Sequence, residues 1–147
     1  MNQKINVKIM MTRDMPTPEY ATDGSAAVDL RAAESLVINP GQRAMVPTGV
    51  HIAPDSKNVV AIVAARSGLA IKHGISLSNG IGVIDSDYRG EICVGLINHS
   101  DKAFSIERGD RVAQLMFMPV LMAKFIETES LDRTERGEGG FGSTGVK

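Results

Sequence analysis

The chain is a series of short apolar runs that are separated by glycine and proline turns. Turn sequences such as Asn39-Pro40-Gly41 and Pro47-Thr48-Gly49 interrupt it every few residues. Runs with the composition and alternation of strands occupy residues 5–9, 36–38, 44–46, 50–53, 59–64 and 92–97, and further apolar runs follow at 104–106, 109–117 and 120–126. Many short strands between such turns are typical of a β-sandwich or barrel, so the sequence predicts an all-β fold.

One short helix interrupts this pattern. It is predicted over residues 66–74, where Ser67 could cap the start and Gly74 could end it in a left-handed conformation.

Size and charge restrict the possible functions. A chain of 147 residues is enough for one domain with a real core. A net charge of -1 argues against nonspecific binding to nucleic acid, whereas a small anion needs only a few local arginines. No apolar run approaches the roughly 20 residues of a membrane span, and the single cysteine fits a reducing compartment, so a soluble cytoplasmic protein is expected.

The centre of the chain, residues 79–90, combines features of a ligand-binding loop. Gly80 and Gly82 allow close approach to the backbone, the residues beside Gly82 are apolar, and Asp85 and Tyr88 precede a turn that ends at Gly90. We predict a hairpin in which Cys93 lies opposite residues 81–83, with backbone groups available to the edge of a planar ligand. Cys93 itself is interpreted as a small buried side chain and not as a nucleophile.

The last residues differ from the rest of the chain. Residues 135–147 contain five glycines and a lone aromatic side chain, Phe141, and cannot bury enough apolar surface to fold alone. Arg136, Ser143 and Thr144 are suited to phosphate binding. We predict a β domain over residues 1–134 and a flexible lid over 135–147 that orders on an anionic ligand.

Five separated segments together resemble the trimeric dUTPase family, the deoxyuridine triphosphate nucleotidohydrolases. They are residues 25–32, 65–70, 79–91, 109–115 and 136–145, in the family's order and at similar spacing. The resemblance implies a distorted jelly-roll barrel and a homotrimer in which the tail of one subunit closes a site built by two others. It also implies hydrolysis of dUTP to dUMP and pyrophosphate with Mg²⁺, which keeps uracil out of DNA and supplies dUMP.

The resemblance also implies roles for the central residues. Asp85 matches the base that activates the water attacking the α-phosphorus, while Asp87 is assigned only to the turn. Tyr88 matches the residue on which the deoxyribose packs. Uracil recognition is expected from the Asn79 side chain and from the backbone around Gly82, Val83, Ile84 and Cys93.

Phosphate and metal binding are expected from side chains spread along the chain. Phe141 would stack on uracil, and Asp29 would contact Mg²⁺ through water while the triphosphate holds the ion. The spacing of the three histidines does not suit a metal site. Gly142 is expected to contact the substrate. The residues expected around the phosphates are Arg66, Ser67, Gly68, Gln114, Arg136, Ser143 and Thr144.

One departure and two alternatives stay open at this point. Ala27 stands where the family usually has glycine, which costs on the order of 1 kcal/mol if that position needs a positive φ. A dCTP deaminase-like relative would share the fold and the Arg66-Ser67 pair, although the Asp85 to Gly90 segment and the tail favour the triphosphatase. A noncatalytic trimer that binds nucleotide is the other alternative, and no residue favours it.

Overall fold

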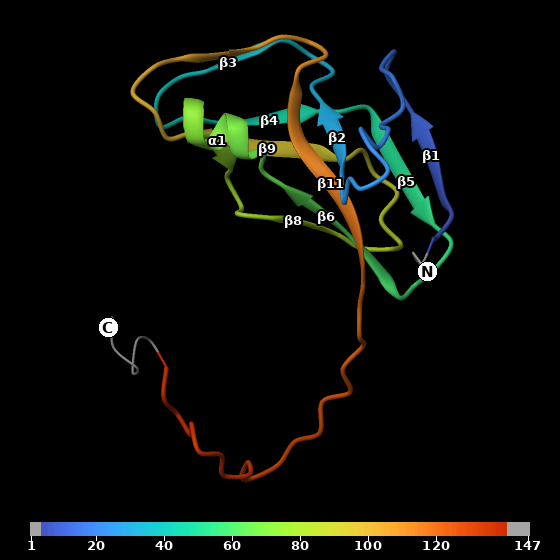
Figure 1. Ribbon diagram of the computed structural model, residues 1–147, viewed down its shortest axis with the longest axis vertical. Coiled ribbons are helices and arrows are strands. Elements are labelled where there is room, and N and C mark those ends of the chain that lie inside the picture. The colour runs from blue at the N-terminus through green and yellow to red at the C-terminus, as the bar shows by residue number, and fades with distance from the viewer. Residues whose placement is uncertain (1–3, 141–147) are drawn as a thin grey trace.

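The computed structural model describes residues 4–140, which form eleven strands and one helix (Figure 1). The elements are β1 (Val7–Met11), β2 (Val28–Arg31), β3 (Leu36–Ile38), β4 (Arg43–Pro47), β5 (Val50–Pro54), β6 (Val59–Ala64), α1 (Ser67–His73), β7 (Ile75–Leu77), β8 (Gly82–Ile84), β9 (Cys93–Asn98), β10 (Phe104–Ile106) and β11 (Arg111–Pro119). The predicted all-β class is confirmed.

The strands form four antiparallel sheets. The largest has the order β2-β11-β6-β8, and the second has the order β4-β9-β7. Two further pairs, β1 with β5 and β3 with β10, complete the strand pairing. Because most neighbours in these sheets are distant in sequence, the fold depends on long-range pairing and not on local hairpins.

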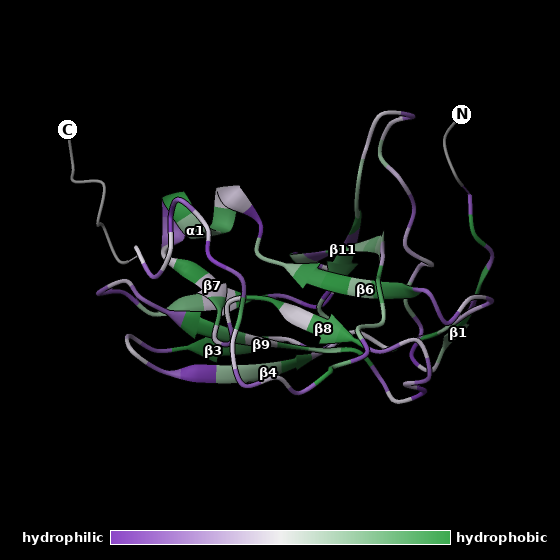
Figure 2. Cartoon of the chain, turned by 90° about the horizontal axis from the view of Figure 1, so that it is seen from below, coloured by the Kyte–Doolittle hydropathy of each residue, from purple (hydrophilic) through white to green (hydrophobic). Residues whose placement is uncertain are grey.

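The core lies between the two larger sheets. Alternate residues of β6 and β9 are buried, as expected for strands with one face inward. The apolar cluster combines Leu30, Val63 and Leu115 of the first sheet with Val46 and Leu96 of the second. In Figure 2, apolar colouring dominates these strands, whereas the polar colours gather on the loops.

The helix α1 has seven residues and ends as predicted. Gly74 adopts a left-handed conformation with φ of 67°, and its N–H donates to the Ala70 carbonyl. The predicted cap at Ser67 is wrong, because Arg66 occupies the N-cap position and no side chain caps the helix. Within residues 4–140, no helix is long and apolar enough to cross a membrane.

The predicted central hairpin is also wrong. β8 pairs with β6, whereas β9 lies between β4 and β7 in the other sheet. One backbone hydrogen bond of 2.9 Å, from Ser78 N–H to the Gly95 carbonyl, still joins the turn before β8 to β9. Alternation in the sequence shows that both segments are strands, but it does not show which strands are partners.

The chain leaves the barrel after β11. The predicted run at 120–126 forms no strand, and residues 120–140 extend away from the sheets (Figure 1). The apolar side chains of residues 120–126 are largely exposed, and the exposed fraction is 99% for Leu121 and 93% for Phe125. The boundary between residues 134 and 135 stays a prediction.

Candidate active site

Asp29 is the centre of a cluster of cationic and amide groups. Its Oδ1 lies 3.0 Å from Arg66 Nε, and its Oδ2 lies 3.4 Å from Arg111 Nη1. The residues meet because β11 pairs with β2 on one side and with β6 on the other, which places Gln114 between Asp29 and Ala64. Arg66 follows the end of β6 and reaches back across the sheet.

Two further hydrogen bonds complete this cluster. Gln114 Nε2 donates to the Ala65 carbonyl at 2.8 Å, and Arg66 Nη1 donates to the Arg111 carbonyl at 3.2 Å. Ser67 and Gly68 come directly after Arg66 and are exposed. The predicted phosphate-binding residues of the barrel therefore lie close together, and guanidinium groups beside an exposed hydroxyl suit an anion.

Sequence reasoning did not assign a role to Arg111. The register of β11 shifts between Arg111 and Ala113, so Arg111 pairs with Arg31 and its side chain reaches Asp29. A bulge of this kind changes which face a residue occupies. In the sequence, the positive charge of Arg111 and its position three residues before Gln114 pointed to a role in the site. Strict alternation along the strand, however, would have placed its side chain on the opposite face of the sheet from Gln114.

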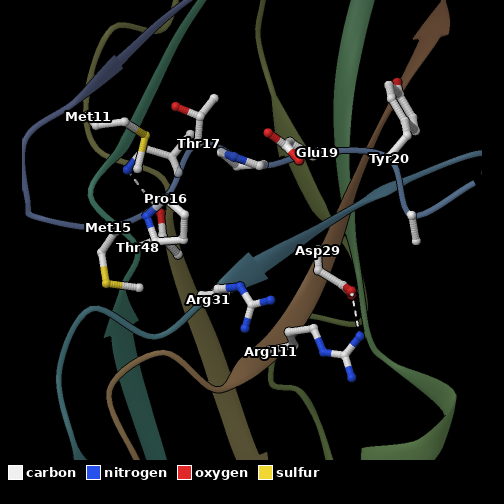
Figure 3. Close-up of a pocket in the computed structure, with 13 residues that line it drawn as sticks. Met11, Met15, Pro16, Thr17, Glu19, Tyr20, Asp29, Arg31, Thr48 and Arg111 are labelled. Atoms are coloured by element: carbon white, nitrogen blue, oxygen red, sulfur yellow. Dashed lines mark hydrogen bonds and ion pairs between the residues drawn. The ribbon is translucent and has the colours of Figure 1, made fainter.

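A pocket of ≈550 Å³ opens beside Asp29 (Figure 3). The figure shows Asp29, Arg31 and Arg111 on one side of it, with Tyr20 and residues of the loop after β1 around the rest. Of the residues predicted to bind substrate or metal, Asp29 alone lines this pocket. The pocket therefore adjoins the cationic cluster but does not contain the predicted uracil and sugar sites.

The predicted uracil-binding backbone forms an edge strand. β8 is the last strand of its sheet and has β6 as its partner, so among residues 4–140 its outer backbone groups face no other strand. Gly82 is needed for this pairing because a Cβ there would lie 2.9 Å from Val63 Cβ. Asn79 is exposed in the turn before the strand. The arrangement leaves peptide groups available to a planar ligand.

Asp85 and Tyr88 lie on the turn after β8. Tyr88 N–H donates to the Asp85 carbonyl at 3.1 Å, and Asp85 itself is exposed. Tyr88 is 44% exposed, and its hydroxyl donates to the Glu91 carbonyl at 3.1 Å. The turn thus presents a carboxylate and an aromatic ring to solvent.

Cys93 begins β9 and differs from its prediction. It is exposed and not buried, because it is the first residue of the strand and the partner strand β7 reaches only as far as Leu96. Although the residue is exposed, desolvation by the protein atoms around the thiol raises the pKa of Cys93, which favours its neutral form. The prediction that Cys93 is not a nucleophile fits this environment.

Asp85 and the cationic cluster lie toward opposite ends of β6, whereas Gly82 pairs with Val63 close to the cluster. Ile84 pairs with Ala61 and Gln114 pairs with Ala64, which are about 10 Å apart at strand spacing. Since β8 and β6 are antiparallel, Asp85 continues away from Arg66. Within one chain, Asp85 therefore lies apart from the cationic cluster along β6.

The tail is described only in part. Arg136 is exposed, and its Nε donates to the Gly139 carbonyl at 2.8 Å within a local turn. Phe141, Gly142, Ser143 and Thr144 lie outside the described residues. Their predicted roles stay predictions.

The described residues hold few possible metal ligands. Between residues 4 and 140, no group of three or more histidine, cysteine or acidic side chains could hold an ion. Asp29 is a single carboxylate with two arginine partners. Such a donor set fits Mg²⁺ only if other ligands, such as phosphates and water, supply most of the coordination.

The fold and the site define an all-β protein with a cluster of arginines whose chemistry suits an anionic ligand. A sequence model of the dUTPase family matches residues 13–145, so the chain belongs to this family. A relative from Desulfitobacterium hafniense is 51% identical over 147 residues, covering 97% of each chain. One from Haemophilus influenzae is 49% identical over 148 residues, covering 97% of this chain and 98% of that protein. Both are named deoxyuridine 5'-triphosphate nucleotidohydrolase.

Solved structures agree with this assignment. The dUTPase of Staphylococcus bacteriophage 80alpha, solved with dUPNHPP, has a TM-score of 0.88 and 25% identity, covering 96% of this chain and 99% of that one. A dUTPase from phage phi11 of S. aureus, described with a structural Mg(II) ion, has a TM-score of 0.80 and 19% identity. The match covers 87% of this chain and 99% of that one. The second likeness concerns the fold alone.

Proposed function

We propose that this chain hydrolyses dUTP to dUMP and pyrophosphate, and that Asp85 activates the water which attacks the α-phosphorus. The observation that carries the proposal is the presence of an anion-binding cluster around Arg66 and an exposed carboxylate at Asp85 in a chain of the dUTPase family. A free nucleotide as the substrate agrees with a cytoplasmic enzyme. Removal of dUTP and supply of dUMP are its consequences.

The active site is shared between subunits of a homotrimer. Asp85 follows β8, whose last residue pairs with Ala61 of β6, whereas Arg66 follows the other end of β6, so we infer that different chains supply these two residues to one substrate. The exposed apolar residues after β11, among them Leu121, Phe125 and Ile126, support association because such surface is costly in a monomer. Three chains arranged by a threefold axis give three equal sites.

Asp85 suits the task of a general base. It is exposed at a turn and no ion pair among the described residues engages it, so its carboxylate is free to accept a hydrogen bond from water. The guanidinium groups of the arginines stabilise the negative charge that develops on the phosphate. Asp87 stays a turn residue.

Substrate selection follows from the β8 segment. Uracil presents an N3–H donor between two carbonyl acceptors, and fixed peptide groups around Gly82, Val83, Ile84 and Cys93 accept this pattern but repel that of cytosine. The 5-methyl group of thymine has no room against a close backbone. Tyr88 packs on the deoxyribose where a 2'-hydroxyl would need space, and Asn79 contributes a side-chain amide.

The phosphates are held by Arg66, Ser67, Gly68 and Gln114, and we add Arg111 because of its contact with Asp29. Bound Mg²⁺ would supply neutralisation of phosphate charge, held mainly by the triphosphate, with Asp29 contacting its water shell. Asp29 also orients both arginines. The tail of another subunit then closes the site: Arg136, Gly142, Ser143 and Thr144 contact phosphate, and Phe141 stacks on uracil.

The proposal is tested by pyrophosphate release from dUTP, UTP, dTTP and dCTP, each with and without Mg²⁺. We expect kcat/KM for dUTP to exceed the others by more than about a hundredfold, since a tight pocket rejects added groups more strongly than an apolar pocket does. Equal rates for the four nucleotides would contradict the proposal. Ammonia from dCTP would favour the deaminase-like alternative, and binding without turnover would favour a noncatalytic trimer.

A further inference from the structure

The ring of Tyr88 lies directly over Gly90. A Cβ on Gly90 would be 2.2 Å from the Tyr88 hydroxyl oxygen and 2.4 Å from Cζ, closer than any real contact. The hydroxyl donates to the Glu91 carbonyl at 3.1 Å, which fixes the free end of the ring. The position of the ring therefore depends on the absence of a side chain at residue 90.

Glu91 is held in turn by two other parts of the chain. Its Oε1 accepts hydrogen bonds from Arg13 Nε at 3.0 Å and from Gly49 N–H at 2.8 Å. Arg13 is oriented by a second ion pair, with Glu34, at 2.6 Å. Burial alone would raise the pKa of Glu91, but the Gly49 N–H and the Arg13 guanidinium outweigh it and lower the pKa, so the carboxylate is charged at neutral pH.

Gly49 permits this arrangement. It has a φ of 73°, and a Cβ there would lie 2.9 Å from Arg13 Cβ. The turn that carries Tyr88 also contacts β5, since His51 Nδ1 lies 2.9 Å from the Arg89 carbonyl oxygen. The loop that carries Tyr88 is thus held by hydrogen bonds to the β4–β5 turn, to β5 and to the segment after β1, all of which are distant in sequence.

We propose that Gly90, Glu91 and Arg13 are positioning residues that fix the Tyr88 ring and thereby set the discrimination between deoxyribose and ribose. This inference rests on the proposed function, in which the deoxyribose packs on Tyr88. A ring that can shift leaves room for a 2'-hydroxyl, whereas a fixed ring excludes it. None of the three residues needs to contact the substrate.

The test compares the ratio of kcat/KM for dUTP to that for UTP in Gly90→Ala, Glu91→Gln and Arg13→Met. This ratio does not depend on the fraction of folded enzyme, so a purely destabilised variant keeps it. We expect a fall of about tenfold or more in Gly90→Ala and of about threefold to tenfold in the other two. Gly24→Ala is the matched control, since a Cβ there meets no atom within 4 Å, and its ratio should equal that of the parent.

Tyr88→Ala separates the inference from its premise. If Tyr88→Ala loses discrimination while Gly90→Ala, Glu91→Gln and Arg13→Met keep the parental ratio, the positioning role is wrong and the sugar-packing role stands. If Tyr88→Ala itself keeps the parental ratio, the sugar-packing role is wrong and the inference falls with it. Loss of discrimination in both Tyr88→Ala and Gly90→Ala supports the proposal.

Discussion

Asp85→Asn should bind dUTP with nearly parental affinity and hydrolyse it about 10²–10⁴ times more slowly, the range that a positioned general base contributes. The amide has the size of the carboxylate but cannot take a proton from water. Asp85 is exposed at the turn after β8, so the substitution leaves the core unchanged. Pyrophosphate release and equilibrium binding of a slowly hydrolysed dUTP analogue measure the two effects separately.

Asp87→Asn is the matched control for this variant. It lies on the same turn, is also exposed, and has no assigned role in the chemistry. We expect it to hydrolyse dUTP at close to the parental rate. If Asp85→Asn released pyrophosphate as fast as Asp87→Asn, Asp85 would not be the base.

Removal of residues 136–147 should leave a folded trimer with kcat/KM lower by about 10²-fold or more, because an open site loses positioning contacts and admits water. The strands end at Pro119, so the truncation removes no element of the barrel. Circular dichroism and the mass in solution report the fold and the trimer, and pyrophosphate release reports activity.

A shorter truncation controls for loss of chain length. Removal of Val146 and Lys147 alone leaves the segment 136–145 intact and should retain parental activity. Full turnover by the longer truncation would show that the tail does not act as a lid. Loss of the trimer in the longer truncation would instead assign the tail to assembly.

Much of the fold was predictable because local patterns determine it. The run from Val59 to Ala64 alternates between buried and half-buried residues, and Gly74 ends α1 with the conformation that glycine adopts most readily. Both features depend on residues within a few positions of each other. The strands at 36–38 and 59–64 were therefore placed to the residue.

Strand pairing was not predictable from the same patterns. β8 and β9 are close in sequence, and a hairpin was the simplest interpretation, but their partners are β6, β4 and β7. Partner choice depends on burial of whole faces across the barrel. The run at 120–126 has the composition of a strand, yet its side chains stay exposed in one chain.

The site was predicted as a set of residue types and not as a geometry. The meeting of Asp29, Arg66 and Gln114 follows from the position of β11 between β2 and β6, which no short motif encodes. Arg111 was missed because a register shift changes its face. Arg13 is linked to Tyr88 through Glu91, although the two residues are 75 positions apart in the sequence. Only the folded structure shows this link.

In the proposed trimer, one site takes Asp85 from one chain and Arg66 from another. Two inactive variants, Asp85→Asn and Arg66→Gln, test it when they are co-expressed in equal amounts. In a cyclic trimer, every mixed assembly holds one site with both residues intact, so random mixing should restore about a quarter of the parental activity. Each variant expressed alone provides the baseline.

The decisive measurement is therefore the rate of pyrophosphate release by the co-expressed pair, divided by the rate of the parental trimer. A recovery to about a quarter is the result that a shared site requires. A mixture that stays as inactive as either variant alone, with mixed trimers shown by native mass spectrometry, would mean that Asp85 and Arg66 act within one chain.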